Sequence, residues 1–502
     1  MTDEDAHALR AENAQLRAQL SELLQKFATL TDRVAELTAV VSRKKRSGRA
    51  AEEPGTLSTV ALPADRPPPP SLPPAPEPEA TAVKPSGRQP LPEHLDVVSE
   101  SYRPDACKHC GANQLRVIGE ETVDKLDTVR EHLRVRRIVR KTCRCHACNK
   151  TTTAEMPPMP WHKSKTTSAV IAHVVHQKIG LHIPLDRMRR DFAVRGVPIA
   201  ISTLVSMMFK AGDLLTAIDG EHWRQLLGGT WLQTDGSGID VVLEGHPGVV
   251  RGIIDVFTRD DVAVYTFGLS KNGDDFAEKL AKFSGKLVAD AESRLNETYR
   301  SGRIVEAGCN AHGLRKFEDA LGEQPILAAE AMQFLQAMFL EDAAARDAGL
   351  VGEDRIRWRQ ERIAPISRTF RRWLDAVGPT LLPSTPLAKA VRYTTNHWDA
   401  LMRFLDDADI PMHNNASERL FRPLDTGRLN WLFAGNPEAA HNLAVLMGLV
   451  ATCRLQGIDP AAYLAWALDR RGTWRDRFGL HASRLTPAAY KQALEKSEAD
   501  AG

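Results

Sequence analysis

The stretch TWLQTDGSGIDVV, residues 230–242, and the later run GKLVAD, residues 285–290, decide the fold class of this chain. Each has a short apolar strand pattern that leads to an aspartate, Asp235 in the first and Asp290 in the second. Between them, VVRGIIDVF and AVYTFGL predict two strands joined by the turn TRDD, and GDDFAEKLAKF predicts an amphipathic helix. We therefore predict the order β-β-β-α-β, with strands that end at both aspartates.

Two further segments extend this unit. RIVEAGC predicts a fifth strand, and the helix after it carries His312 and Arg315. A third acid, Glu418, lies much later, in HNNASERLFRPL, and is followed by Arg419 and Arg422. Carboxylates at neighbouring strand ends meet at one edge of a sheet, and hard divalent cations prefer oxygen ligands. The three acids therefore predict a site for Mg²⁺ or Mn²⁺ that acts on phosphodiesters.

Each acid also has a purely local interpretation. Asp235 precedes Gly236 and fits a turn, and Asp290 fits a helix cap before AESRLNETY. Asn415 followed by Glu418 fits an N-cap with a capping-box acid. Only the three-dimensional structure distinguishes these roles from a shared site.

Length and composition limit the class of protein. A chain of 502 residues suggests several domains, and its net charge of +2 means that affinity for nucleic acid must come from local basic patches. No apolar run approaches the roughly 18 residues that span a membrane, and MTDEDAH is not a signal peptide. We expect a cytoplasmic protein without a membrane partner.

The N-terminus has an unbroken heptad pattern. Residues 6–41 contain no proline or glycine, and their two core rows predict a coiled coil that pairs two chains, with Asn13 fixing a parallel register. The rows are Leu9, Leu16, Leu23, Leu30 and Leu37, and Asn13, Leu20, Phe27, Val34 and Val41. A single amphipathic helix packed on the body is the alternative. Residues 50–94 are dense in proline and predict an extended spacer.

Five of the seven cysteines lie between Cys107 and Cys148. Two CxxC pairs, separated by 34 residues, predict a closed tetrahedral Zn²⁺ site with the ligands Cys107, Cys110, Cys145 and Cys148. Cys143 is an additional thiol and is the alternative to Cys145 as a ligand. The intervening residues predict a basic β-ribbon with Leu133, Val135 and Ile138 inward. Residues 104–150 carry 11 Lys/Arg against 6 Asp/Glu, which suits DNA.

Two regions have helical periodicity. Residues 166–218 predict three helices, the second starting at Pro184 and the third capped near Ser202 or Thr203, in an arrangement similar to a helix-turn-helix. Residues 320–400 predict a helical insertion between the second and third acids. We expect its tryptophans to pack internally and its arginines to face DNA or water. These residues are Trp358, Trp373 and Trp398, and Arg355, Arg357, Arg359 and Arg362.

Taken together, WLQTDGSG, KLVAD, GCNAHGLRKF, HNNASERLFRPL and GRLNWLFAGN resemble the landmarks of the insertion sequence sixty-six family of DDE transposases, over nearly the whole chain. The resemblance implies an RNase H-like catalytic domain whose triad is Asp235, Asp290 and Glu418. Two positions depart from the family's usual pattern. Gly236 and Ser237 replace Glu and Thr after Asp235, and His413 replaces the acid before the paired asparagines.

The implied function is cleavage of transposon ends and strand transfer into target DNA. Mg²⁺ or Mn²⁺ would be held by the triad, and Zn²⁺ would be structural. Phosphate would be oriented by His312, Arg315, Arg419 and Arg422. The expected partners are double-stranded DNA, a second copy of the chain, and accessory proteins of the same bacterial element. The alternatives are a non-catalytic zinc-dependent DNA-binding regulator and a metal-dependent nuclease without strand transfer.

The predicted fold class is a multidomain α+β protein. The expected parts are a coiled-coil arm (1–46), a proline-rich linker (47–98), a zinc-binding module (99–160), a helical DNA-binding region (161–225), the first part of the RNase H-like core (226–319), a helical insertion (320–408), the last part of the core with Glu418 (409–450), and a C-terminal helical region (451–502).

Overall fold

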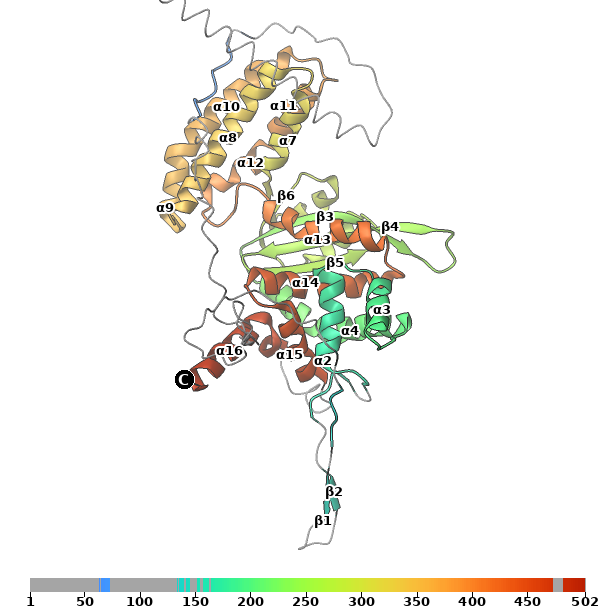
Figure 1. Cartoon of the computed structure of the whole chain (residues 1–502). Helices are drawn as coiled ribbons and strands as arrows, with labels where there is room; N and C mark the ends of the chain where they lie inside the picture. The colour runs from blue at the N-terminus through green and yellow to red at the C-terminus, as the bar shows by residue number, and fades with distance from the viewer. Residues whose placement is uncertain are drawn as a thin grey trace, which may run out of the picture. The chain divides into compact units, whose positions relative to one another are not determined.

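The computed structural model describes residues 63, 65–72, 133, 135–139, 141–144, 151–153, 157–161, 164–472 and 482–501. The predicted coiled coil and the four predicted zinc ligands lie outside these residues, so both remain predictions. The described residues combine helices with one five-stranded mixed sheet and one two-stranded ribbon (Figure 1). The chain is therefore an α+β protein, as the strand and helix patterns predict.

The mixed sheet has the spatial order β5-β4-β3-β6-β7. Its first three strands are antiparallel to one another, whereas β6 is parallel to both β3 and β7. The strands are β3 (Trp231–Val242), β4 (Val249–Arg259), β5 (Val262–Gly268), β6 (Gly285–Ala289) and β7 (Ile304–Gly308). The predicted β-β-β-α-β order and the fifth strand are confirmed.

The end of β3 is where the prediction is wrong. The strand does not stop at Asp235 but continues to Val242, because residues 233–242 pair without interruption with β4, from Gln233–Thr258 to Val242–Val249. The glycines after Asp235 therefore lie in extended backbone rather than in a turn. Pairing between β3 and β6 is much shorter and ends at Gln233–Val288. Beyond that pair, β6 no longer accompanies β3, and near the end of the strand Val241 forms an isolated parallel bridge with Ala434.

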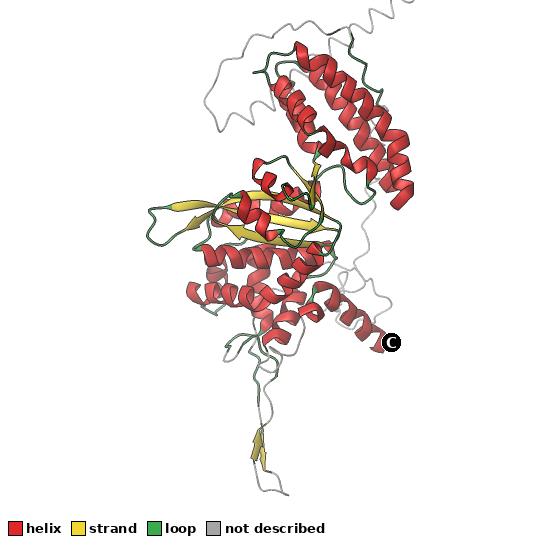
Figure 2. Ribbon diagram, turned by 180° about the vertical axis from the view of Figure 1, so that it is seen from behind, coloured by secondary structure: helices red, strands yellow, loops and turns green. Residues whose placement is uncertain are grey.

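One face of the sheet is covered by a group of helices that share the main apolar core with β3, β4 and β5 (Figure 2). Its centre is α14, which is buried on almost all sides and starts at Pro437 after the N-cap Asn436. Gly448 allows close approach, because a Cβ there would lie 3.2 Å from the Ala263 carbonyl of β5. The helices are α2 (Ser168–Val175), α3 (Leu185–Val194), α4 (Ile201–Leu227), α13 (Asn415–Trp431), α14 (Pro437–Leu455) and α15 (Pro460–Gly472).

The opposite face carries a smaller apolar core around Phe257, Phe276 and Leu287. It is formed by α5 (Gly273–Lys279), the 3₁₀ turn η2 (Ser293–Leu295) and α6 (Asn296–Tyr299). The N-cap Asn272 begins α5 by accepting a hydrogen bond from the Asp274 amide. Asp290 is not a helix cap, because Glu292 precedes η2 in that role.

The predicted helical insertion has its own apolar core, centred on Phe334, Phe370 and Trp373 (Figure 1). Its helices begin where proline occupies the first turn, at Pro325 and Pro386. The elements are α7 (Asn310–Ala320), α8 (Pro325–Asp347), α9 (Gly352–Trp358), the π-helix η3 (Arg359–Ile363), α10 (Ala364–Val377), η4 (Gly378–Thr380), α11 (Pro386–Asn396), α12 (Trp398–Met402) and η5 (Arg403–Asp406). Trp373 is fully buried and Trp398 packs on Phe370, which fits the predicted packing role.

The region before the sheet has the three predicted helices, with α2 continued by the π-helix η1 (His176–Gly180). Its third helix, α4, is longer than predicted and is not capped by Ser202 or Thr203, since Ala200 is the N-cap and no side chain caps it. By length and composition, α4 is the one described helix that could cross a membrane. Its buried residues Leu204, Leu215 and Ile218 belong to the main core, so its apolar character is explained by packing.

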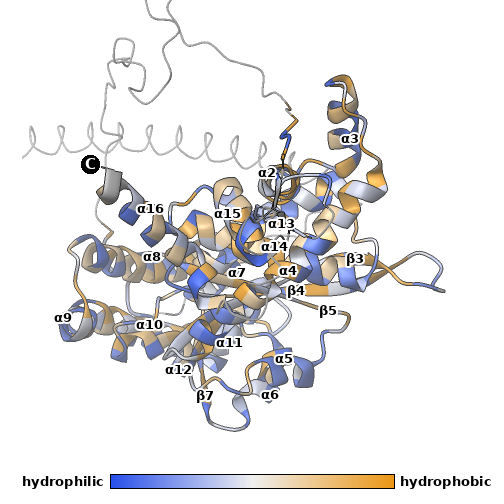
Figure 3. Ribbon diagram, turned by 90° about the horizontal axis from the view of Figure 1, so that it is seen from below, coloured by the Kyte–Doolittle hydropathy of each residue, from blue (hydrophilic) through white to orange (hydrophobic). Residues whose placement is uncertain are grey.

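The described part of the predicted zinc module is a short antiparallel ribbon of β1 (Thr142–Arg144) and β2 (Thr151–Thr153). The predicted inward row does not hold at Val135, which is 91% exposed and lies outside any strand, whereas Leu133 packs against the main core. At the other end of the chain, η7 (Ala482–Leu485) and α16 (Pro487–Ala501) complete the structure. Colouring by hydropathy shows polar and apolar residues mixed along most of these helices (Figure 3).

Candidate metal centre at the sheet edge

Two aspartates occupy equivalent positions on neighbouring parallel strands. The last parallel pair of β3 and β6 is Gln233–Val288, and Asp235 and Asp290 each lie two residues beyond it. Residues two apart on a strand share a face, so the matching offset directs both carboxylates to the same side of the sheet. The site begins where β6 ends and β3 continues without it.

The third acid is brought to this point by the N-terminus of α13. The Asn414 side-chain amide donates to the Thr234 carbonyl at 3.3 Å, and the Ser417 amide donates to Gln233 Oε1 at 3.4 Å. These bonds hold the helix start on β3, and Glu418 follows one residue later. The capping-box interpretation is wrong, because the N-cap is Asn414 and its side chain makes no capping bond.

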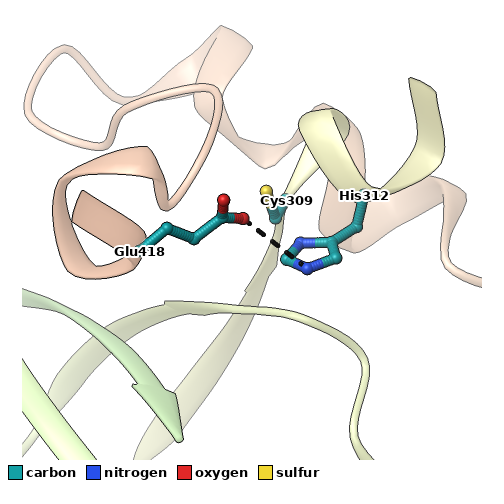
Figure 4. A group of neighbouring side chains, drawn as sticks. All are labelled: Cys309, His312 and Glu418. Carbon is teal, nitrogen blue, oxygen red and sulfur yellow. Dashed lines mark ion pairs between the residues drawn. The ribbon is translucent and has the colours of Figure 1, made fainter. Parts of the chain in front are cut away.

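His312, from the first turn of α7, contacts both the second and the third acid, and Figure 4 shows its ring beside Glu418. Its Nε2 is 3.6 Å from Asp290 Oδ2 and 3.6 Å from Glu418 Oε1. On the same helix, an Arg315 guanidinium nitrogen is 3.5 Å from Glu418 Oε2. The structure therefore brings together four of the residues singled out from the sequence.

Arg419 and Arg422 occupy a different position from these four. Both belong to the first half of α13 and are exposed. Exposed arginines beside a cluster of acids are available to phosphate groups that approach from solvent.

The acids carry more negative charge than the surrounding cations balance. Burial raises the pKa of Asp235 to about 6, against a hydrogen bond from the Gly236 amide, and the charges of Glu418, Glu292 and Asp290 raise it further. Glu418 Oε1 and His312 Nδ1 are buried without a hydrogen-bond partner among the described residues. Buried polar atoms without partners are rare, and a cation would satisfy the carboxylate.

The donor atoms indicate which cation fits. Cys309 Sγ, a His312 ring nitrogen and a Glu418 oxygen lie within 4.8 Å of one another. Figure 4 shows these three side chains turned toward one another. However, Cys309 is fully buried, and its sulfur accepts a hydrogen bond from the Asn414 amide at 3.4 Å. Burial also raises the pKa of this thiol to about 11, which favours the neutral form. A buried neutral thiol is a poor ligand, so carboxylate oxygens are the better donors here, and oxygen donors suit Mg²⁺ or Mn²⁺.

Two further contacts fix residues at or near the acids, and local sequence patterns did not indicate either of them. The Tyr393 hydroxyl, from α11 of the insertion, donates to Asp290 Oδ1 at 2.9 Å. Asn310 donates from its side chain to the Leu401 and Met412 carbonyls, so it ties the start of α7 to the segment that leads to α13. Both residues act through positions far apart in sequence, which explains why local patterns did not identify them.

A buried arginine in the insertion also supports the third acid. Arg359 is fully buried, contrary to the prediction that it faces DNA or water. Its guanidinium pairs with Asp342 at 2.7 Å and donates to the carbonyls of Phe404, Asp407 and Ile410. The first of these carbonyls belongs to η5, and the other two belong to the segment between η5 and α13. The insertion is therefore bonded to the chain that carries Glu418.

His413, one of the two departures from the usual family pattern, stands just before this helix. Its ring lies 5.8 Å from the ring of Phe339, and its Nδ1 accepts a hydrogen bond from the Asn415 amide at 3.4 Å. Burial lowers the pKa of His413, which favours the neutral form that can accept this bond. The histidine thus serves the helix start by hydrogen bonding.

The other departure, Gly236, makes room for an arginine on the opposite face of the sheet. A Cβ at position 236 would lie 2.3 Å from an Arg294 guanidinium nitrogen. Arg294 pairs with Asp255 at 2.6 Å, and Lys279 pairs with the same carboxylate at 3.0 Å. The space that a side chain at position 236 would need is therefore filled by the Arg294 guanidinium.

Comparison with known proteins identifies the family of this α+β chain. Residues 163–442 match the Transposase IS66 family, and residues 104–149 match the zinc-finger binding domain of transposase IS66. Since the first match covers more than half of the chain, the protein belongs to the IS66 family of transposases.

Similar proteins occur in Sinorhizobium fredii. The uncharacterized protein y4jD is 29% identical over 401 residues, which cover 76% of this chain and 78% of the relative. The uncharacterized protein y4hP is 27% identical over 415 residues, which cover 76% of this chain and 74% of the relative. The similarity therefore extends well beyond the sheet.

Proposed function

We propose that this transposase cleaves the ends of its own mobile element and joins them to target DNA, using Asp235, Asp290 and Glu418 as the ligands of Mg²⁺ or Mn²⁺. The observation that carries the proposal is the meeting of Asp290 and Glu418 at His312, since these acids are 128 positions apart in the chain. The three antiparallel strands followed by two parallel strands support an RNase H-like core.

The proposed chemistry assigns a role to each side chain. A bound divalent cation would lower the pKa of a water molecule that it binds and would balance negative charge on the phosphate. Asp235 and Asp290 would hold it from the sheet, and Glu418 would complete the site from α13. His312 orients both Asp290 and Glu418, and Arg315 lies beside Glu418.

DNA would approach from the side of the exposed arginines. Arg419 and Arg422 would bind backbone phosphates and leave the carboxylates to the scissile group. Two ends must be held together for joining, which suits the coiled coil predicted for residues 1–46. The zinc module at 99–160, with Zn²⁺ on its four cysteines, and the helical region at 161–225 would read the ends. Accessory proteins of the element would assist in the bacterial cytoplasm.

Asp290→Asn tests this proposal. We expect it to abolish Mg²⁺-dependent nicking and joining of the element's terminal repeats while DNA binding stays near the wild-type level. The matched control is Asp274→Asn, which makes the same change at an exposed position on α5 and should leave both activities unchanged. Measurements are a strand-transfer assay with labelled ends, with and without chelator, and a binding assay at fixed salt.

Each remaining outcome has a definite meaning. Nicking that persists in Asp290→Asn would overturn the assigned site. Wild-type protein that binds the ends but never nicks them would indicate the non-catalytic regulator. Nicked ends without joined product would indicate a nuclease that lacks strand transfer.

A further inference from the structure

Part of the proline-rich linker contacts the helical insertion. The structure describes residues 65–72 of this linker, which include Arg66 followed by four prolines, 67–70. Arg66 donates two hydrogen bonds to Glu330 of α8. Its Nε is 2.8 Å from Oε2, and its Nη2 is 2.9 Å from Oε1. This two-point geometry is the strongest form of an arginine–carboxylate pair.

Further hydrogen bonds define both ends of the contact. Gln333, one turn after Glu330 on α8, donates from its side chain to the Pro70 carbonyl at 2.9 Å. At the other end, Arg66 donates to the Pro63 carbonyl at 2.9 Å, which folds the segment around its own guanidinium. The two bonds to α8 are four residues apart in the linker, so they fix its direction as well as its position.

The carboxylate of Glu330 is held in place by the core of the insertion. Its Oε2 also accepts a hydrogen bond from Trp373 Nε1 at 2.9 Å, and Trp373 is fully buried in the core of the insertion. The side chains of Arg66 and Glu330 are only 20% and 17% exposed. Burial tends to raise the pKa of Glu330, but the bonds from Arg66 and Trp373 outweigh burial and hold the pKa below its ordinary range.

The proline content of the segment suits such a site because it restricts the backbone before docking. Proline has a fixed φ, and consecutive prolines favour an extended chain without internal hydrogen bonds, so little conformational entropy is lost on docking. The carbonyls of such a chain are free to accept bonds, as Pro70 does from Gln333.

We propose that α8 and α10 of the insertion form a binding site for an arginine followed by prolines, and that its occupant is residues 65–72 of the same chain. The linker is then divided at this point into two shorter tethers. One joins the site to the N-terminal arm, and the other joins it to the zinc module. The proposal changes the predicted spacer into an anchor and does not depend on the catalytic assignment.

Competition by a free peptide tests the proposal on the full-length chain. The probe is a fluorescent peptide of residues 63–72, PADRPPPPSL. In the wild type, the attached segment competes at an effective concentration of about 1 mM, so the peptide should bind weakly or not at all. Arg66→Glu removes the attached competitor by charge repulsion, and the peptide should then bind at least roughly tenfold more tightly than to the wild type.

Three variants serve as controls. Arg88→Glu makes the same charge change elsewhere in the linker and should leave the site closed to the peptide. Arg66→Glu combined with Glu330→Arg restores an opposite-charge pair and should close the site to a second peptide that carries Glu in place of the arginine, whereas Glu330→Arg alone should bind that second peptide. Circular dichroism and the unfolding midpoint verify that each variant is folded. Folded Arg66→Glu protein that binds the peptide no better than the wild type would overturn the proposal.

A mixing experiment decides whether the segment docks on its own chain. Arg66→Glu chains are refolded together with chains that carry Glu330→Arg. Docking within one chain leaves every site in the mixture mismatched, so the peptide should still bind the Arg66→Glu chains. Exchange between two chains would pair the reversed charges and exclude the peptide, which would contradict docking within the chain.

Discussion

Two aspartates on opposite faces of the same sheet have opposite surroundings. Asp235 on β3 lies among Asp290, Glu292 and Glu418, whose charges raise its pKa. Asp255 on β4 is only 1% exposed, yet Arg294 and Lys279 both pair with its carboxylate. The charge of a carboxylate that pairs with protein cations is balanced within the fold. A carboxylate that lies among other carboxylates needs a bound cation to balance its charge. The difference separates a structural carboxylate from a candidate metal ligand.

The largest expected effect comes from the first of these acids. Asp235→Asn should reduce Mg²⁺-dependent nicking by roughly 10³-fold or more, the scale seen when a central catalytic group is removed. The folded state should not be weakened, because the substitution relieves repulsion among carboxylates. Nicking rates and urea unfolding of the metal-free protein measure the two effects. A stability loss comparable to that of a buried ion pair would mean that Asp235 is structural.

The same substitution on the other face should have the reverse effect. Asp255→Asn leaves Arg294 and Lys279 without their carboxylate, and loss of one partner from a buried pair costs about 3–5 kcal/mol. Urea unfolding should show this loss, while the folded fraction should keep its nicking activity per molecule. If Asp255→Asn abolished activity without changing stability, the comparison between the two faces would fail.

A somewhat smaller effect is expected at Arg359. Arg359→Met removes the closer of the two arginines that pair with Asp342, since Arg355 lies 3.5 Å away, and frees the three carbonyls that precede α13, so we expect a loss of about 3 kcal/mol in stability. The half-saturating Mn²⁺ concentration for nicking should also rise by roughly tenfold, the scale of changes at residues that support metal ligands. Arg357→Met, at a side chain that is 65% exposed two residues earlier, is the matched control. An unchanged Mn²⁺ dependence would restrict Arg359 to a purely structural role.

The smallest effect is expected at Asp219, the third aspartate in this comparison. Like Asp235 it has no cationic partner among the described residues, but it makes no contact with the candidate metal centre. Its Oδ1 is buried without a partner among the described residues, and burial raises its pKa to about 8. The folded protein then holds a proton that the unfolded chain releases above a pKa of about 4. Stability from this group is therefore present at low pH and is lost as pH rises towards 8.

Asp219→Asn should remove this contribution. The variant should lose less stability than the wild type between pH 5 and pH 8, as measured by urea unfolding at both values. Equal pH dependence of the two proteins would show that Asp219 is ionised in the folded state. The result would also show whether absence of a cation alone is enough to raise the pKa of a buried acid in this fold.

The strand and helix patterns predicted most of the sheet, because apolar alternation is a local property of residues 230–308. They failed at Asp235, where pairing with β4 extends β3 through two glycines that look like a turn in isolation. They also failed at Asn415 and Glu418, because the start of α13 is fixed by Gln233 and Thr234 rather than by its own side chains. In both places a distant segment overrides the local preference.

By itself, the sequence determined the order of strands and helices, the family, and which acids to consider. Those are properties of periodicity and of short motifs, which need no contact between distant residues. Only the tertiary structure decided that Asp290 and Glu418 share His312, that Asp255 is neutralised, and that Arg359 is buried. A carboxylate in the sequence has no partner until the fold supplies one, and the partner determines whether its charge is balanced within the protein or left for a metal ion.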